Sequence, residues 1–186
     1  MTARRVAIID AMRDPFGDPA PSFDDPLGML SACHTRIERQ LSTLERLARH
    51  LPEHGADAQA RNAARGILRY FDTAEPNHHA DEEASVFPRL LAHSASVREL
   101  VMDLQSQHEG LHARWRTLRP LLAGIASGQR ANLPPRLVNE VQEAYARHIA
   151  LEDETLLPLC SDLLGEDDLA AIGREMAARR ATIGAA

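Results

Sequence analysis

Seven side chains that can bind metal ions recur at helical spacing along this sequence. They are His34, His79, Glu83, His108, His112, His148 and Glu152. Six of them form pairs four positions apart, and residues at that spacing project from one face of a helix on adjacent turns. Imidazole and carboxylate groups without thiolates suit iron, manganese or zinc. The pattern therefore predicts a metal site built between helices.

The charge of the two glutamates supports the same prediction. A buried carboxylate without a partner is strongly unfavourable or becomes protonated. The sequence contains no Lys, and no Arg stands at the apolar positions in phase with Glu83 and Glu152. Metal cations would balance both charges. Five histidines, two bridging carboxylates and one bridging oxide or hydroxide would fill all but one of the positions of two octahedral ions, which leaves room for one small ligand.

The elements that must position these groups are amphipathic helices. Leucine and other apolar residues recur every three or four positions, which is typical of one helical face. This periodicity predicts helices over residues 26–51, 57–92, 96–122 and 137–159, and a shorter one over 167–180.

Local signals mark where these helices begin and end. Ser96 with Glu99 three residues later predicts a capping box at the start of the third helix. Pro52, His54 and Gly55 predict the end of the first helix, and Pro76 predicts either a kink in the second helix or its restart. We expect an all-α protein, an up-and-down four-helix bundle with an irregular N-terminal lead-in and a short C-terminal helix. Residues 1–25 would form the extension, 26–164 the bundle, and 165–186 the final helix and tail.

Composition excludes several classes of function. The formal charge is −6, from 21 basic and 27 acidic residues, which argues against binding to nucleic acids or anionic membranes. Two cysteines, Cys33 and Cys160, are too few for a disulfide framework or an iron–sulfur cluster. No signal-like or membrane-spanning apolar run is present, so the cytoplasm is the expected compartment.

Two segments resemble the hemerythrin, or HHE cation-binding, domain family. They are His78-His79-Ala80-Asp81-Glu82-Glu83 followed by Val86-Phe87-Pro88, and His148-Ile149-Ala150-Leu151-Glu152-Asp153-Glu154 ending at Leu157-Pro158. His34 and the His108/His112 pair also fall where the family places ligands. The resemblance covers roughly residues 25–162 and implies a non-haem, oxo- or hydroxo-bridged di-iron centre in a four-helix bundle. Family members bind dioxygen reversibly, sense oxygen or iron, or handle nitric oxide and peroxide.

One ligand position has two candidates. Oxygen carriers of this family use an Asp five residues after the last histidine, which corresponds to Asp153. Many bacterial and iron-sensing relatives use a Glu four residues after it, which corresponds to Glu152. Helical phase favours Glu152, at roughly 40° from His148 against roughly 140° for Asp153. Ferritin-type chemistry is disfavoured, because it uses Glu-x-x-His pairs, whereas the predicted ligands here follow His-x-x-x-Glu and His-x-x-x-His spacing.

Three residues beside the predicted ligands each have two candidate roles. We expect His78 at the edge of the site or at the surface, and Glu75 either orienting His79 or in solvent. Tyr145 would either donate a hydrogen bond to a bound oxygen species or pack in the core with its hydroxyl satisfied elsewhere.

The predicted metal site is compatible with three functions. The first, which we favour, is a protein that binds dioxygen or a related small ligand at iron for sensing, storage or delivery. The second is a di-iron enzyme that consumes peroxide, dioxygen or nitric oxide, and the third is an iron buffer. Zinc or manganese could replace iron, since availability decides which metal is loaded.

Overall fold

The computed structural model describes residues 21–183, and every regular element in that range is helical. Four long helices form the bundle: α1 (Pro26–His54), α2 (Ala58–Asp81), α4 (Arg98–Ala126) and α5 (Pro135–Leu151). Two short helices, α3 (Phe87–His93) and α6 (Leu157–Leu163), extend α2 and α5, and α7 (Glu166–Ile183) follows. The predicted all-α bundle with a C-terminal helix is confirmed. Of the predicted N-terminal extension, residues 1–20 lie outside the described range.

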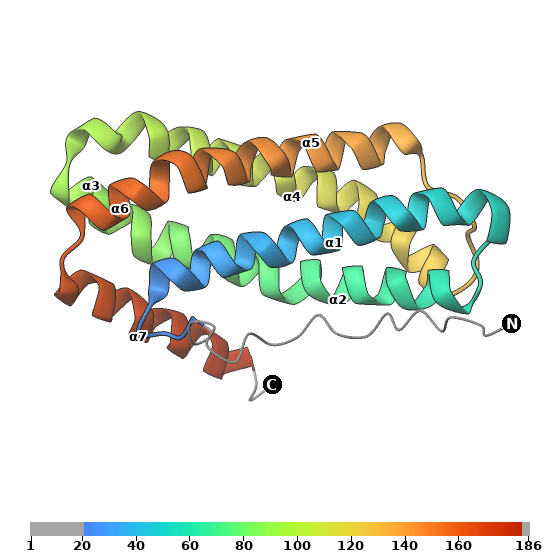
Figure 1. Ribbon diagram of the computed structural model, residues 1–186, viewed down its shortest axis with the longest axis horizontal. Coiled ribbons are helices and arrows are strands. Elements are labelled where there is room, and N and C mark those ends of the chain that lie inside the picture. The colour runs from blue at the N-terminus through green and yellow to red at the C-terminus, as the bar shows by residue number, and fades with distance from the viewer. Residues whose placement is uncertain (1–20, 184–186) are drawn as a thin grey trace, which may run out of the picture.

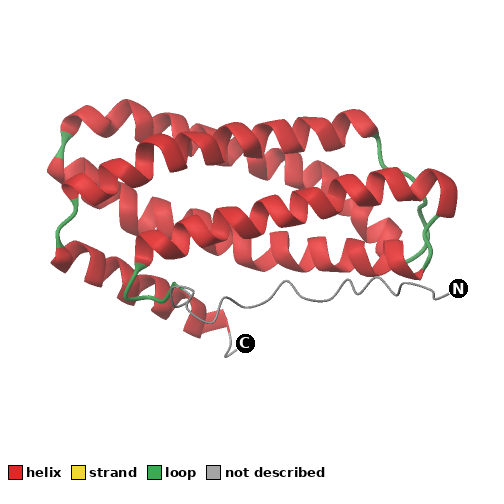
Figure 2. Cartoon of the chain, viewed as in Figure 1, coloured by secondary structure: helices red, strands yellow, loops and turns green. Residues whose placement is uncertain are grey.

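The long helices run alternately up and down along the long axis of the molecule (Figure 1). Helix α1 packs against α2 and α5, and α4 also packs against α2 and α5. This square arrangement brings the inward faces of all four helices to a common interior. Short loops join them, and α7 lies outside the square against α1 and α2 (Figure 2).

Pro52 and Pro76 both lie inside helices, although α1 does end at the predicted place. Helix α1 continues through Pro52 to His54 and ends at Gly55, whose φ of 63° is in the left-handed region that favours glycine. Helix α2 likewise runs through Pro76 without ending. In both cases packing within the bundle outweighs the local preference of proline to break a helix.

The third long helix begins differently from the predicted capping box at Ser96. A short 3₁₀ turn (Ala95–Val97) comes first, and its cap is Ser94, whose side chain accepts a hydrogen bond from the Ser96 amide. Helix α4 then starts at Arg98 without a side-chain cap, because the preceding turn leads directly into it.

The real interruptions are two π-helical segments, η1 (Glu82–Val86) and η3 (Glu152–Leu156). In each, the amide that follows the segment, of Phe87 or Leu157, bonds to the carbonyl of its first glutamate, five residues back. The next residue is a proline in both cases, and a proline has no amide hydrogen for the normal helical ladder. Single π turns of this kind occur frequently at functional sites.

The core consists of two apolar clusters. One includes Ile37, Phe71 and Leu111, and the other includes Leu30, Val86 and Leu104. Along each long helix, the residues between the two clusters are polar and buried. The bundle therefore places a polar layer between two dry apolar regions.

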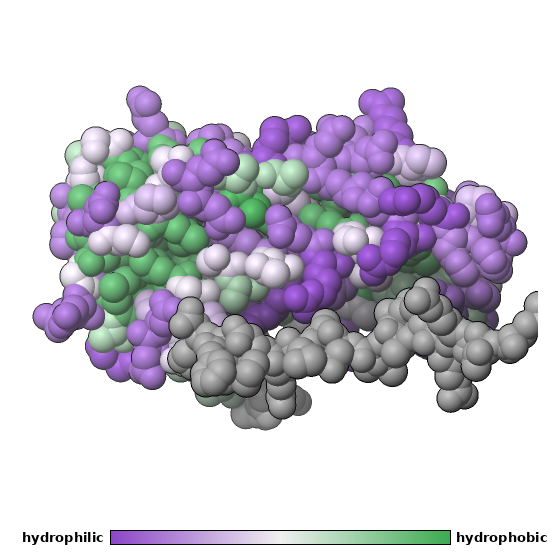
Figure 3. All heavy atoms as spheres, in the orientation of Figure 1, coloured by the Kyte–Doolittle hydropathy of each residue, from purple (hydrophilic) through white to green (hydrophobic). Residues whose placement is uncertain are grey.

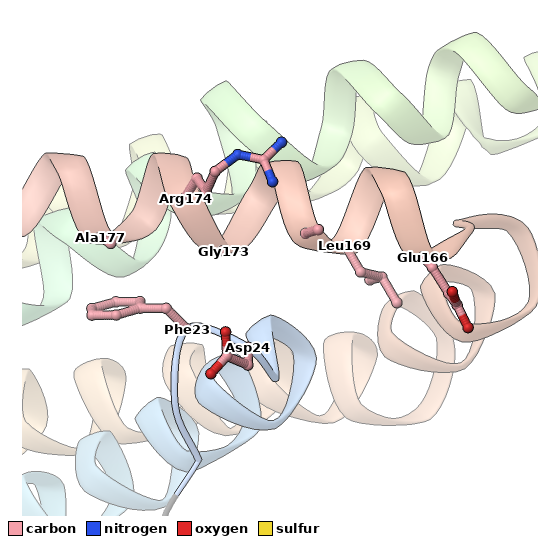
Figure 4. A pocket seen from close by; sticks show the side chains of 8 residues that line it. Phe23, Asp24, Glu166, Leu169, Gly173, Arg174 and Ala177 are labelled. Atoms are coloured by element: carbon pink, nitrogen blue, oxygen red, sulfur yellow. The ribbon is translucent and has the colours of Figure 1, made fainter.

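Helix α7 packs on the outside of the bundle. Gly173 faces the backbone at Phe23, and a Cβ at position 173 would collide with the Phe23 carbonyl oxygen. Next to this contact, a cavity of about 370 Å³ is lined by Phe23, Asp24 and one side of α7 (Figure 4). None of its lining residues belongs to the buried polar layer.

The surface is mixed. Figure 3 shows apolar side chains gathered over the end of the visible face where α1 begins and α6 lies. Among the described residues, no helix combines the length and the apolar character that a membrane span needs.

Candidate metal centre

Six side chains form a compact cluster in the buried polar layer. Each is no more than 2% exposed, and they come from all four long helices and both π segments. The cluster consists of His34, His78, Glu82, His108, His148 and Glu152. Their potential ligand atoms fall into two groups of four residues, and atoms within a group lie within 4.8 Å of one another.

The two groups share both glutamates. Glu82 lies between His78, which is 3.4 Å from its Oε1, and His108, which is 3.3 Å from its Oε2. Glu152 has the same arrangement, with His34 at 2.9 Å from Oε2 and His148 at 3.2 Å from Oε1. Each carboxylate therefore offers one oxygen to each histidine pair, as a carboxylate that bridges two metal ions does.

The opposite nitrogens of three imidazoles contact other side chains. Nδ1 of His34 lies 2.7 Å from Asp153, and Nδ1 of His108 lies 2.7 Å from Glu83. Both carboxylates are partly exposed, at 43% and 42%. A carboxylate that accepts from Nδ1 fixes the ring orientation and leaves Nε2 free to bind a metal ion. Nδ1 of His148 contacts the Gln107 amide oxygen at 3.2 Å in the same way.

The protonation of the cluster follows from its burial and its charges. Burial alone would lower the pKa of His34, but contacts with Glu152 and Asp153 raise it to about 9. Burial also opposes protonation of His108, while contacts with Glu152 and Glu82 raise its pKa to about 10. Burial, reinforced by the nearby Glu152 charge, raises the pKa of Glu82 to about 8. In this state, protons supply the positive charge that metal ions would supply.

The other two histidines remain neutral. Burial lowers the pKa of His78 to about 3 and that of His148 to about 4. Neutral imidazoles have the free lone pair that metal binding requires.

The cluster also contains many buried polar atoms without a hydrogen-bond partner. They include Nε2 of all four histidines and both carboxylate oxygens of Glu82 and Glu152. Buried polar atoms are normally satisfied, so such a concentration needs an explanation. A metal centre would satisfy all of them at once, so the residues present fit such a group.

The structure distributes the seven sequence-predicted residues over three places. His34, His108, His148 and Glu152 lie in the central cluster. His79 and His112 lie beside it in another group, and His79 also lies within ligand distance of His108 and His148. Glu83 is partly exposed and contacts His108 from outside.

Sequence reasoning missed two members of the cluster, His78 and Glu82. His78 is fully buried, contrary to the expectation that it lies at the edge or surface. A signal for both was present. His78 and Glu82 precede Pro88 by ten and six positions, and His148 and Glu152 precede Pro158 by the same numbers. The prediction relied on the periodicity of apolar residues instead, and this periodicity favoured the neighbouring residues 79 and 83 as ligands.

The two candidates at the end of α5 occupy different positions. Glu152 is fully buried and contributes to both groups, whereas Asp153 contacts His34 from the outside. The arrangement thus follows the helical phase that favoured Glu152.

A second polar group lies next to the central cluster and consists of Glu75, His79 and His112. His79 Nδ1 is 3.1 Å from His112 Nε2 and 3.3 Å from Glu75 Oε1. The Tyr145 hydroxyl donates to Glu75 at 2.7 Å, so it is satisfied away from the central cluster. Glu75 is buried rather than solvated, and burial raises its pKa to about 7. The His79 ring stacks on His108 at 3.9 Å between centroids.

The fold and the site together define a helical bundle with a buried His/Glu cluster suited to metal ions. The chain matches the Hemerythrin HHE cation binding domain over residues 25–160. It is also 36% identical to an uncharacterized protein of Haemophilus influenzae over 159 residues, which cover 86% of this chain and 92% of the relative. The chain belongs to the hemerythrin HHE cation-binding domain family.

Proposed function

We propose that the central cluster holds two iron ions and that this centre binds dioxygen or a related small ligand for sensing, storage or delivery. The observation that carries the proposal is the sharing of Glu82 and Glu152, each with one oxygen toward each histidine pair. One ion would lie between these glutamates and His34 with His78. The other would lie between them and His108 with His148.

The composition of the cluster supports iron. All its donor atoms are imidazole nitrogens and carboxylate oxygens, which suit iron and also admit manganese or zinc. Four imidazoles and two bridging carboxylates fill about eight of the roughly twelve positions of two octahedral ions. Each ion would then keep at least one coordination position open for an exogenous ligand. Ferrous ions, when bound, supply both electrons and a coordination position to a small oxidising ligand.

The surroundings favour binding over turnover. The cluster lies between two apolar regions of the core, which limit the access of water and of the protons that promote irreversible oxidation. A turnover enzyme needs a proton donor directed at the bound ligand. Tyr145, the tyrosine in phase with the ligands, donates to Glu75 instead.

The test is the visible spectrum of protein loaded anaerobically with ferrous iron, exposed to air and then deoxygenated. Iron content is measured in parallel, and we expect two ions per chain. Bands that appear in air and vanish on deoxygenation would support reversible binding. Bands that persist would overturn it in favour of an enzyme or an iron buffer, and the absence of iron-dependent bands would overturn the di-iron assignment.

A matched pair of variants assigns the bands to the cluster. His148→Ala removes an imidazole of the central cluster and should abolish them. His93→Ala removes an exposed histidine at the end of α3 and should leave them unchanged. Equal loss in both variants would contradict the assignment.

A further inference from the structure

We propose that Glu75, His79 and His112 form a separate mononuclear site for a divalent transition-metal ion such as Zn²⁺. The site shares no ligand with the two groups assigned to iron, although a ligand atom of His79 also lies within 4.8 Å of ligand atoms of His108 and His148 in the central cluster. Two of its members are histidines whose spacing predicted metal binding, and the third is a buried carboxylate.

The distances fit a shared cation. With metal–ligand bonds of about 2.0–2.1 Å, neighbouring ligand atoms of a tetrahedral site lie roughly 3.3 Å apart. The His79 Nδ1 atom lies 3.1 Å from His112 Nε2 and 3.3 Å from Glu75 Oε1. All three ligand atoms lie within 4.8 Å of one another.

A proton satisfies this group less completely than a metal ion would. A hydrogen on His79 Nδ1 can point well at only one of its two neighbours, the His112 nitrogen or the Glu75 oxygen. A cation between the three atoms contacts all of them. It also neutralises the Glu75 carboxylate, which is 1% exposed and whose other contact is the neutral hydroxyl of Tyr145.

The surroundings of the group resemble those of exchangeable metal sites. Tyr145 donates to Glu75 at 2.7 Å and thereby orients the carboxylate, as outer partners of metal ligands do. His112 is only half-buried, so an ion can reach the site from solvent. Three protein ligands leave a fourth tetrahedral position for water or another small molecule.

The experiment compares Zn²⁺ stoichiometry by equilibrium dialysis and elemental analysis in the full chain and four variants. His112→Gln and Glu75→Gln keep hydrogen-bonding groups of similar size but weaken metal binding. Each should bind one equivalent fewer than the unmodified protein. His93→Gln, an exposed histidine outside the site, should bind as much as the unmodified protein. His148→Ala should lose ions from the central cluster and keep the additional one.

The outcomes separate this proposal from the di-iron proposal. If His112→Gln and Glu75→Gln bind as much Zn²⁺ as the unmodified protein, the group is only a hydrogen-bonded cluster and the inference is wrong. Loss in these two variants together with unchanged binding in His148→Ala would support the additional site and overturn the central one. Circular dichroism of each variant identifies a loss caused by unfolding, and Glu75→Asp, which retains a carboxylate, should then recover part of the binding.

Discussion

Two segments of the bundle, residues 78–88 (the first arm) and residues 148–158 (the second arm), each contain a π-helical turn and use the same ligand pattern in different surroundings. Residues 78–88 of the first arm correspond to residues 148–158 of the second, with a constant offset of 70 positions. Both arms have His-x-x-x-Glu, a π turn that begins at the glutamate, and a proline six residues after it. An acidic residue directly after each glutamate contacts an imidazole from a different helix, at 2.7 Å in both arms. Each arm therefore contributes one histidine and one shared glutamate to the six residues of the central cluster.

The arms differ at the positions between the ligands. The first arm has His79 and Asp81 where the second has Ile149 and Leu151. Asp81 is fully buried and is held by Arg179 and by Arg180, whose Nη2 lies 2.6 Å from its Oδ2. Both arginines belong to α7. The first arm thus carries an anchor for the C-terminal helix and an additional polar group, whereas the second arm is apolar at the same positions.

One more correspondence joins the arms. Glu75 and Tyr145 each lie three residues before an arm, at equivalent positions, and the Tyr145 hydroxyl donates a hydrogen bond to Glu75 at 2.7 Å. The comparison shows that the features common to both arms contribute to the central cluster. The residues that differ between the arms instead contribute to the neighbouring Glu75–His79–His112 group and to the contact with α7.

The largest expected effect comes from removing a shared carboxylate. Glu82→Gln and Glu152→Gln should each lose both metal ions, because each carboxylate serves both histidine pairs. Each metal ion at a thousandfold excess over its dissociation constant stabilises the folded state by about 4 kcal/mol. At about 2–4 °C per kcal/mol for a chain of this size, each bound ion should raise Tm by roughly 8–16 °C in the unmodified protein, and loading should raise it very little in either variant.

Thermal unfolding with and without metal provides this measurement, and Glu154→Gln, exposed on the same segment, is the control. If one of the two variants retains an ion and the other does not, the two arms are not equivalent.

The second prediction concerns the pH dependence of stability, to which groups within or in contact with the two arms contribute. In the metal-free protein the pKa values of His34 and His108 are raised to about 9 and 10, above the ordinary 6.5. Between pH 6.5 and 9 the folded state therefore binds more protons than the unfolded state, so stability falls as pH rises. The raised pKa of Glu82, about 8 against 4.5, acts in the same direction from pH 4.5 to 8.

We therefore expect Tm of the chelator-treated protein to fall by several degrees from pH 7 to 9.5. Metal-loaded protein should resist this change, because metal ions replace the protons. A metal-free Tm that stays constant or rises over this interval would contradict the proposed protonation of the cluster.

The third prediction tests the outer carboxylates. Glu83→Gln and Asp153→Asn weaken the acceptors at Nδ1 of His108 and His34, and loss of such outer partners costs about 10- to 100-fold in metal affinity. We expect similar losses in the two variants, measured by competition with a chelator of known affinity. A tenfold difference between them would show that one arm dominates metal binding.

The smallest effect is expected at the feature that distinguishes the arms. Asp81→Asn weakens the anchor of α7, and hydrogen bonds to charged groups contribute about 1.5–3 kcal/mol. Because both arginines are partly exposed, we expect the free energy of unfolding, measured with denaturant, to fall by roughly 2 kcal/mol, near the lower end of this range. Metal stoichiometry should not change, and Asp162→Asn on the exposed side of α6 is the control. A loss of bound metal in Asp81→Asn would show that α7 also positions the central cluster.

Much of this architecture could be predicted from the sequence. The apolar periodicity located the four long helices, and the residue types identified a site of imidazoles and carboxylates. Four predicted residues, His34, His108, His148 and Glu152, do lie together in the central cluster. Local signals were uneven guides: helix α1 ends at Gly55 as predicted, whereas α2 continues through Pro76 without a restart.

The choice between neighbouring residues could not be made in this way. His78 and His79 differ by about 100° around the helix, and both border its inward face. Both are buried, but they contact different partners, Glu82 for His78 and His112 for His79. Because hydrophobic phase describes a broad face rather than a direction, it cannot separate two such residues.

The sequence by itself determined the amphipathic helices and the kinds of ligand, because both depend on residue types at fixed spacing. The tertiary structure alone decided which oxygen faces which imidazole, that Glu83 and Asp153 lie outside the cluster, and that Asp81 meets α7. These outcomes depend on the distances between helices that are far apart in the chain. Side chains of equal type and similar phase acquire different roles only when the opposing helices are in place.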